Sequence, residues 1–389
     1  MKEKYNAIIV GGGISGASTA YHLKKFGLEN VLLLERNLPA SGGTGKSAAI
    51  VRQHYSTELM AYLALKSVSL FENMTKDLNV KNAFYKTGYI MLVPEELMEK
   101  ATNNLEMQKK VGIETDWVPK SKWGEFIPWL NTKNISGVIY ETKGGRADPI
   151  LVTEGYINTF KDLGGEVKTN TFCRELIKES NKVSGVIVDE GPIYSDFVIN
   201  AAGPWAKPLA DQADIKLPLK TFREQDTIWQ SRISGDLPSL SISNAVDSIY
   251  FVPQGNKRFL IGKGFPKKYF EVDPYNYKLT ADDEFVANIK NIAEMRFPVL
   301  KDMKLINSYA ALYDVTPDWY PFIGPRKNLI GYVDANGGSG HGFKIGPAIG
   351  YELAKWIIDG KTGNEFEKLS FDRIEKNELF EGAYGGNRG

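Results

Sequence analysis

The chain contains few cysteines and histidines, the residues that form disulfides in small secreted proteins and that bind metals. Its 389 residues include a single cysteine, Cys173, which excludes an internal disulfide framework and favours a cytoplasmic location. Its three histidines, His22, His54 and His341, are too scattered along the sequence to suggest a metal site, and we expect none. We expect His22, in the middle of a predicted helix, to be a surface or packing residue.

The sequence also lacks an excess of charge of one sign and any long apolar run. Lys and Arg together number 48 and Asp and Glu 47, so the net charge of +1 implies neither nucleic acid nor an anionic membrane as a partner. No stretch approaches the roughly 20 apolar residues of a transmembrane helix. The apolar run at residues 7–10 is too short for a signal peptide, because glycines follow it directly. With 42% apolar residues, the chain has enough for the cores of two domains.

The first 36 residues contain the pattern of a dinucleotide-binding βαβ unit. An apolar run at 6–10, typical of a buried parallel strand, leads into Gly11, Gly13 and Gly16, which fill the three glycine positions of G-x-G-x-x-G. A helix should follow, its positive N-terminus directed at a pyrophosphate, and a second strand at 31–34 ends at Glu35. The Glu35 carboxylate can accept from a ribose 2′-hydroxyl and would repel a 2′-phosphate, so FAD or NAD fits and NADP does not.

The rest of the chain alternates between helical and strand patterns. Asp148 and Pro149 are the expected cap and first residue of one helix. Cys173 is expected on a strand as a small buried residue, and the Gly-rich tail after Gly382 is expected to fray. Helices are predicted over 57–77, 94–111, 148–163, 281–295 and 345–359, and strands over 89–93, 165–169, 183–188, 197–202, 248–253, 258–262 and 329–333.

These patterns predict an α/β protein, α+β overall. One domain should be of the Rossmann type and bind the nucleotide, built from residues 1–84, 146–216 and 320–389. The other, from residues 85–145 and 217–319, should contain a mostly antiparallel sheet and contact the substrate.

Two glycine-rich loops have the composition of cofactor contacts. Residues 42–47 offer backbone donors and small hydroxyls that can wrap a pyrophosphate and the inner face of a flavin, although a flexible surface loop would have the same composition. Residues 337–342 can approach a planar ring closely, and a helix after them would point its N-terminus at that ring. The alternative for this second loop is an ordinary helix-entry turn.

Five sequence blocks resemble the D-amino acid oxidase and sarcosine oxidase family of FAD-dependent oxidoreductases. The resemblance covers nearly the whole chain and is strongest to the branch of sarcosine oxidase β-subunits and dimethylglycine dehydrogenases. The blocks are Val10–Gly16, Gly43–Gln53, Val198–Trp205, Leu312–Asp318 with Ile323–Pro325, and Gly337–Lys344. The family implies FAD as the cofactor and a small amine or amino acid as the substrate.

The resemblance also implies roles for individual residues. Arg52 matches a pocket arginine that binds the carboxylate of an amino-acid substrate, and Lys344 matches a lysine over the N5 edge of the flavin. From its position on a predicted strand of the second domain, Tyr250 is either a second donor to the substrate or an ordinary core tyrosine. His341, like His54, is a candidate supporting residue near the flavin. The predicted cofactor contacts are Gly11, Gly13, Ile14, Ser15, Gly16, Glu35, Arg36, Thr44, Gly45, Lys46, Ser47, Ala48, Cys173, Ala202, Gly203, Trp205, Gly337, Gly338, Gly340, His341, Gly342, Phe343 and Lys344.

Three departures from relatives refine this interpretation. Ala311 stands where monomeric sarcosine oxidases have the cysteine that bonds to the flavin, and Gly45 and Lys46 stand where dimethylglycine dehydrogenases have a histidine. We therefore expect non-covalent FAD. Ala49 replaces a second pocket arginine of monomeric sarcosine oxidases, which favours the branch whose members often work with a partner subunit.

The sequence therefore predicts an FAD enzyme that oxidises the C–N bond of sarcosine, glycine, proline or a similar amino acid by hydride transfer to flavin N5. Oxygen, a quinone or a partner subunit would take the electrons, and the chain would form a homo- or hetero-oligomer. Two alternatives remain open: oxidation of a 2-hydroxy acid or glycerol phosphate, and a flavoprotein subunit without independent oxidase activity.

Overall fold

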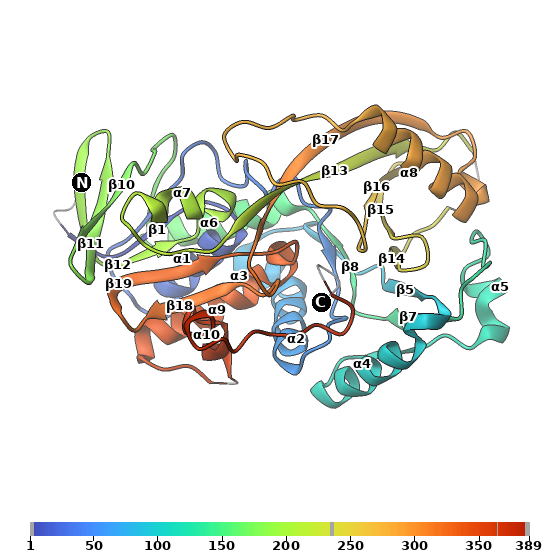
Figure 1. The fold of residues 1–389 in the computed structure, drawn as a ribbon, viewed down its shortest axis with the longest axis horizontal. Helices are drawn as coiled ribbons and strands as arrows, with labels where there is room; N and C mark the ends of the chain where they lie inside the picture. The colour runs from blue at the N-terminus through green and yellow to red at the C-terminus, as the bar shows by residue number, and fades with distance from the viewer. Residues whose placement is uncertain (1–3, 234–236, 364, 386–389) are drawn as a thin grey trace.

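Two large sheets at opposite ends of the longest axis organise the protein (Figure 1). The structure is a computed structural model that describes residues 4–233, 237–363 and 365–385. In it, β1 (Lys4–Val10), α1 (Ile14–Lys25) and β2 (Val31–Leu34) form the predicted βαβ unit, with β1 and β2 parallel. No helix in the described part of the chain is long and apolar enough to cross a membrane.

The first sheet has a parallel centre with antiparallel strands at one side. Its main order is β10-β11-β19-β12-β1-β2-β9, with β18 paired to β19. The strands β19, β12, β1, β2 and β9 run parallel to their neighbours in that order. Besides β1 and β2, this sheet contains β9 (Glu166–Lys168), β10 (Glu175–Glu179), β11 (Lys182–Val188), β12 (Gly191–Asn200), β18 (Phe322–Arg326) and β19 (Leu329–Asn336).

Both faces of this sheet are covered, which explains the uninterrupted apolar runs of its central strands. Along β1, Ala7 and Ile9 belong to one core cluster with residues of α1 and α9 (Gly342–Asp359). Ile8 and Val10 belong to a second cluster with residues of β11, β12 and α7 (Ala206–Asp211). The carboxyl ends of β1 and β2 therefore open onto a crevice between covered faces, the place where parallel sheets of this type bind ligands.

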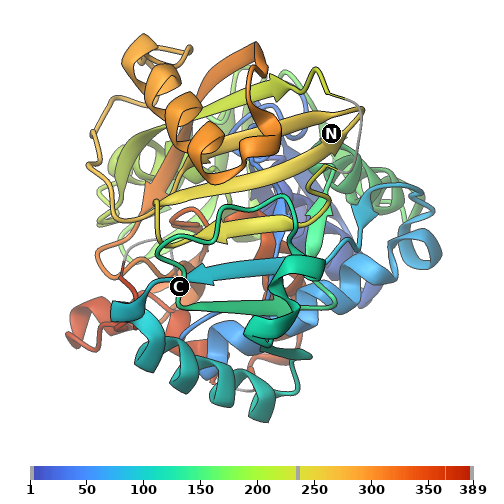
Figure 2. The ribbon, with the colours of Figure 1, turned by 90° about the vertical axis from the view of Figure 1, so that its right-hand side faces the viewer.

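The second sheet is mostly antiparallel, as predicted, and one of its faces is turned toward the viewer in Figure 2. Its order is β17-β13-β16-β15-β14-β5-β7-β6, with a single parallel pair, β14 and β5. A small sheet of β3 (Ile50–Val51), β8 (Gly145–Ala147) and β4 (Phe84–Tyr85) accompanies it. The large sheet comprises β5 (Tyr89–Val93), β6 (Thr115–Trp117), β7 (Gly137–Glu141), β13 (Lys220–Gln230), β14 (Ser241–Asn244), β15 (Ile249–Gly255), β16 (Arg258–Lys263) and β17 (Lys304–Val315).

The α-helices that cover the sheets follow the sequence patterns closely. The Asp148 side chain caps the helix that starts at Pro149, accepting from two backbone N–H groups at 3.0 Å, as predicted. Besides α1, the α-helices are α2 (Glu58–Glu72), α3 (Met74–Leu78), α4 (Met98–Val111), α5 (Trp123–Phe126), α6 (Pro149–Asp162), α7 (Ala206–Asp211), α8 (Asp283–Arg296), α9 (Gly342–Asp359) and α10 (Asp372–Glu375). Short 3-10 helices are η1 (Glu95–Leu97), η2 (Lys120–Lys122), η3 (Gly203–Trp205), η4 (Pro298–Leu300) and η5 (Phe366–Leu369).

The structure corrects three local predictions. The helix expected over 57–77 is interrupted at Asn73, whose side-chain amide donates to the Ser69 carbonyl at 2.7 Å and so competes with the helical hydrogen bonds. The last helix begins at Gly342 rather than Ile345, so its N-terminus reaches into the glycine-rich loop. Cys173 lies in the loop between β9 and β10, not on a strand.

The chain passes back and forth between the two large sheets. Residues 4–34, 166–200 and 322–336 contribute strands to the first, whereas residues 89–141, 220–263 and 304–315 contribute strands to the second. The exact limits of the two domains stay a prediction. Residues 35–49 connect β2 of the first sheet to β3 of the small sheet, and residues 316–321 connect β17 of the second sheet to β18 of the first.

Candidate cofactor and substrate site

A large cavity extends from the carboxyl ends of β1 and β2 to the second sheet. The glycine turn after β1 lines one end of it, through Gly11 and Gly13. Arg52 and Lys344 also line it, as do Asp226 and Tyr250 of the second sheet. The cavity therefore joins the predicted nucleotide site to the predicted substrate site.

The glycine turn packs as a dinucleotide fold requires. A Cβ on Gly16 would lie 2.0 Å from the Gly11 carbonyl oxygen, so only glycine allows α1 to approach β1 this closely. Gly11 has a φ of +114° and abuts the Ala201 carbonyl at the end of β12. The turn therefore leaves the N-terminus of α1 open toward the cavity, where backbone N–H groups can bind phosphate.

Glu35 lies directly after β2, where the sequence placed it. Its Oε2 accepts from the Gly12 N–H at 2.7 Å, and its Oε1 accepts from the Asn37 N–H at 2.8 Å. These two bonds hold the carboxylate against the glycine turn and at the cavity wall. The arrangement fits recognition of a ribose hydroxyl.

The loop after β2 contacts both the start of α1 and the second sheet. Thr44 Oγ1 accepts from the Ile14 N–H at 3.1 Å, which ties the loop to the start of α1. Ala40 and Ala49, near the two ends of the loop, have φ values of +62° and +51°, a region costly for alanine. The Lys46 ammonium donates to the Tyr277 hydroxyl at 3.0 Å and to the Ala310 carbonyl at 3.1 Å, so the loop also contacts the second domain.

The start of α9 forms another wall. Asp314 Oδ2 accepts from the N–H groups of Gly337 and Gly338 at 2.7 and 3.1 Å and so fixes the turn before the helix. Nearby, the Nε1 of Trp205 and the Oδ1 of Asn336 are buried and have no hydrogen-bond partner in the described part of the chain, and both residues line the cavity. These unpaired polar atoms, the open glycines and the two helix N-termini fit a dinucleotide cofactor.

The structure places most of the predicted contacts at this cavity. Four predicted residues do not line it: Gly16 packs on Gly11, Gly45 on Ala40, Gly337 on Thr316, and the buried His341 ring lies 5.5 Å from the Tyr55 ring. Those that line it are Gly11, Gly13, Ile14, Ser15, Glu35, Arg36, Thr44, Lys46, Ser47, Ala48, Arg52, Cys173, Ala202, Gly203, Trp205, Tyr250, Gly338, Gly340, Gly342, Phe343 and Lys344.

Arg52 is a buried cation in the cavity wall, with 7% of its surface exposed. One guanidinium nitrogen donates to the His54 carbonyl, and the guanidinium lies 4.7 Å from the centre of the Tyr55 ring. Behind it, Glu141 accepts from the Gln53 N–H at 2.7 Å, and burial raises the pKa of this carboxyl to about 7 against the charge of Arg52. Burial and the nearby Arg52 lower the pKa of Lys344 well below its usual value.

All three histidines are buried, and burial keeps their side chains neutral at neutral pH. Burial, with help from Arg52, lowers the pKa of His54 to about 3, and burial lowers the pKa of His341 well below its usual value. Burial also lowers the pKa of His22 to about 3, and this side chain packs among the rings of Tyr156 on α6 and Tyr351 on α9.

The wall from the second sheet contains two carboxyl groups that the sequence analysis did not select. Glu224 and Asp226 stand two residues apart on β13, so their side chains share one face of the sheet. The Lys267 ammonium pairs with Glu224, and Tyr250 donates its hydroxyl proton to Asp226 at 2.6 Å. The Tyr250 hydroxyl proton is therefore directed at Asp226 in this structure, and a role of Tyr250 as a donor to the substrate stays a prediction. Two acids at this spacing in a strand that enters a ligand pocket were a usable signal.

The end of the chain packs against the Arg52 region instead of fraying. Tyr384 is 6% exposed, its hydroxyl lies 3.2 Å from His54 Nε2, and the two rings are stacked. The Ala383 N–H donates to Ser56 Oγ at 3.0 Å. Figure 1 shows the end of the described chain between α2 and β8. The prediction of a frayed tail is thus wrong for residues 383–385, and residues 386–389 lie outside the described residues.

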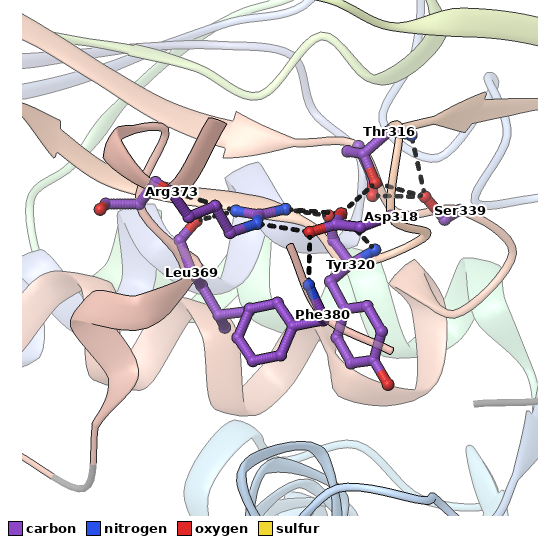
Figure 3. A network of polar contacts seen from close by, with 9 residues as sticks. Thr316, Asp318, Tyr320, Ser339, Leu369, Arg373 and Phe380 are labelled. Atoms are coloured by element: carbon purple, nitrogen blue, oxygen red, sulfur yellow. Dashed lines mark hydrogen bonds and ion pairs between the residues drawn. The ribbon is translucent and has the colours of Figure 1, made fainter. Parts of the chain in front are cut away.

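A buried ion pair anchors this C-terminal segment (Figure 3). The Arg373 guanidinium donates to both carboxylate oxygens of Asp318, at 2.7 and 3.0 Å. The same carboxylate accepts from the Phe380 N–H at 3.3 Å, and the Phe380 ring stacks on Tyr320. Asp318 therefore links the loop after β17 to the segment that ends at Tyr384.

The Rossmann-type sheet, the glycine turn with Glu35 and the cavity shared with a second sheet define a nucleotide-dependent oxidoreductase. The FAD dependent oxidoreductase family matches residues 6–356, and this chain belongs to that family. It is accordingly an FAD enzyme, and the resemblance inferred from the sequence is confirmed.

Relatives with assigned names act on amines and amino acids. The 4-methylaminobutanoate oxidase (formaldehyde-forming) of Paenarthrobacter nicotinovorans is 27% identical over 94% of this chain, which spans only 45% of that protein. Sarcosine oxidase subunit beta of Rhodobacter capsulatus is 27% identical, with 92% of this chain and 86% of the relative aligned. The crystal structure of L-proline dehydrogenase from P. horikoshii superposes with a TM-score of 0.90 at 28% identity and covers 98% of this chain and 100% of that one.

Replacing Glu35 with alanine tests the nucleotide end of the cavity. We expect FAD binding to weaken by about 1 to 3 kcal/mol, because a charge-assisted hydrogen bond to the ribose is lost. The measurement is the dissociation constant of FAD for the apoprotein, from quenching of flavin fluorescence. Glu29→Ala, at an exposed acid before β2, is the control. Equal affinities of wild type and Glu35→Ala would place the ribose elsewhere.

Proposed function

We propose that this protein oxidises the C–N bond of a small amino acid or N-alkyl amino acid, such as sarcosine, glycine or proline, to an imine that water hydrolyses. The observation that carries the proposal is the buried guanidinium of Arg52 in the wall of the cavity that begins at the glycine turn. A guanidinium presents a planar fork that matches a carboxylate, so it can fix the carbon next to the nitrogen in one orientation.

The similar proteins support the same substrate class. A sarcosine oxidase subunit, a 4-methylaminobutanoate oxidase and an L-proline dehydrogenase all act on amines that also carry a carboxylate. In the proposed complex, the residues at the glycine turn, at 44–48 and at the start of α9 hold FAD, which supplies the ring that accepts the hydride. Arg52 holds the substrate carboxylate, and Lys344 places its amine at the flavin edge.

We propose that FAD is held without a covalent bond. The Lys46 ammonium is occupied by Tyr277 and a carbonyl, and Ala311 has no atom that could bond to a flavin. Acid precipitation should therefore release all of the yellow colour into the supernatant.

The acidic wall formed by Glu224 and Asp226 favours an amine over a phosphate-bearing alcohol, because a carboxylate attracts an ammonium and repels a phosphate. The names of the beta-subunit relatives support a role for this chain as one subunit of a complex. The electron acceptor would be a partner subunit, a quinone or oxygen. The single cysteine supports a cytoplasmic location.

Anaerobic bleaching of the bound flavin tests the proposal. Holoenzyme is mixed without oxygen with sarcosine, glycine, L-proline, lactate or glycerol phosphate, and the flavin absorbance near 450 nm is followed. We expect an amino acid to bleach it and admission of air to show whether oxygen is an acceptor. Bleaching by lactate or glycerol phosphate alone would establish the hydroxy-substrate alternative instead.

A further inference from the structure

Asp226 and Tyr250 form a bridge across the middle of the second sheet. Both residues are register partners of Gly262, Asp226 from β13 and Tyr250 from β15, so the three stand in a row across adjacent strands. A Cβ on Gly262 would lie 2.2 Å from the Tyr250 hydroxyl and 2.4 Å from Asp226 Oδ1. Only glycine leaves the space in which these side chains meet at 2.6 Å, so the bridge is built into the sheet.

This bridge faces the cavity that contains Arg52 and Lys344. Asp226 is 4% exposed, and its neighbour Glu224 is 5% exposed. The two carboxyls differ in their partners. Glu224 pairs with the Lys267 ammonium, which also donates to the Lys263 carbonyl at 2.8 Å. Asp226 instead accepts a hydrogen bond from the neutral phenol of Tyr250. Asp226 is thus the acid of the pair whose charge is not neutralised by a direct ion pair.

We infer that Asp226, held by Tyr250, is the group that accepts the proton of a cationic amine substrate. The inference rests on the proposed function. An aliphatic ammonium has a pKa of about 10, so an amino acid arrives protonated at neutral pH. The nitrogen needs its lone pair to form the C=N bond. The N–H bond therefore breaks, its proton forms an O–H bond on Asp226, and the hydride from the adjacent carbon passes with two electrons to the flavin.

The electrostatics of the cavity agree with this assignment. Burial raises the pKa of Asp226 to about 7, Tyr250 and Lys267 lower it, and Glu224 raises it. Burial and Asp226 also raise the pKa of the neighbouring phenols Tyr250 and Tyr309 well above their usual value, so both stay protonated. Burial raises the pKa of Glu224 as well, but Glu224 is paired with the Lys267 ammonium. Asp226 is therefore the carboxyl of this cluster that has no ion pair among the described residues and a pKa near neutral pH, as an acid-base group should.

Other bases at the cavity are less suited to this role. His54 has a pKa of about 3 and its Nε2 faces the Tyr384 hydroxyl, while His341 does not line the cavity. Lys344 is the remaining competitor, because burial and Arg52 lower its pKa. The test must separate Asp226 from Lys344.

The pH dependence of flavin reduction makes this separation. Holoenzyme is reduced anaerobically by subsaturating sarcosine or L-proline between pH 5.5 and 10.5, and the second-order rate constant is measured. For the wild type we expect a rate that rises through about pH 7, as Asp226 ionises, and stays high toward pH 10, where the free amine form of the substrate needs no acceptor. Asp226→Asn keeps the Tyr250 contact but should lose the inflection near pH 7 and about 10² to 10⁴ in rate at pH 7.

The rate of Asp226→Asn should recover toward pH 10, where the free amine needs no acceptor, and a merely structural defect would not recover with pH. Tyr250→Phe removes a bond that favours the carboxylate, so the inflection should move above pH 7. Glu271→Gln, at an exposed acid of the same domain, is the control and should keep the wild-type profile. Flavin content and melting temperature of each variant report its folding.

Three outcomes overturn the inference. An unchanged inflection in Asp226→Asn excludes Asp226, and its loss in Lys344→Met but not in Asp226→Asn assigns the proton to Lys344. If neither sarcosine nor L-proline, nor any other amino acid tested, reduces the wild-type flavin at any pH, the proposed function fails, and this inference fails with it.

Discussion

Replacing Arg52 with alanine should slow anaerobic flavin reduction by subsaturating amino acid about a hundredfold or more, because hydride transfer depends on orientation of the reacting carbon. Arg52→Lys keeps a positive charge but loses the planar fork, so we expect an intermediate rate. The matched control is Arg146→Ala, since Arg146 stacks on Tyr85 at 3.9 Å and is not among the residues that line the main cavity. Stopped-flow absorbance gives the rate constants.

Lys344→Met should produce a different kinetic defect. Loss of an amine that can take up a proton near the flavin edge should slow reoxidation by oxygen more than reduction by substrate, because negative charge develops there during oxygen reduction. If Arg52→Ala and Lys344→Met both reduced and reoxidised like the wild type with the best amine found, neither residue would line the reaction site.

Arg373→Met should destabilise the protein by about 3 to 5 kcal/mol, because it leaves the Asp318 carboxylate buried without its cation. The Arg373 and Asp318 side chains are 3% and 1% exposed. The loss should also release Phe380 and, with it, the segment that brings Tyr384 to His54. Urea unfolding followed by tryptophan fluorescence measures the change in unfolding free energy.

A nearby exposed ion pair gives the control. Lys368 and Glu365 pair at 2.7 Å but are 55% and 66% exposed, so Lys368→Met should cost less than about 1 kcal/mol. An equal loss in both variants would show that burial does not determine the effect of Arg373.

The pH dependence of this effect has a defined sign. Burial raises the pKa of Asp318, but the hydrogen bonds and charge of Arg373 outweigh it and hold the pKa below its usual value. A depressed carboxyl pKa contributes stability above the unfolded-state value of about 3.9, and that stability is lost as the pH falls further. The difference between wild type and Arg373→Met should therefore shrink between pH 7 and pH 3.

Local patterns were sufficient for much of the fold and for the nucleotide end of the site. Gly11, Gly13 and Glu35 are close in sequence, and their roles follow from a strand, a turn and a helix that form within 36 residues. Asp148 and Pro149 predicted the start of α6 because capping is a local interaction. Asn73 escaped prediction because its side chain competes with a helix that apolar periodicity alone favours.

The sequence by itself determined the Rossmann-type unit, the family and the candidate cation Arg52, because each was recognised from short blocks of neighbouring residues. Only the tertiary structure decided which distant groups face the substrate. Asp226, Gly262 and Tyr250 meet because the register of three antiparallel strands aligns them. Tyr384 reaches His54 because a buried ion pair holds the end of the chain. Strand register and long-range packing are set by the burial of the whole core, which no local sequence pattern encodes.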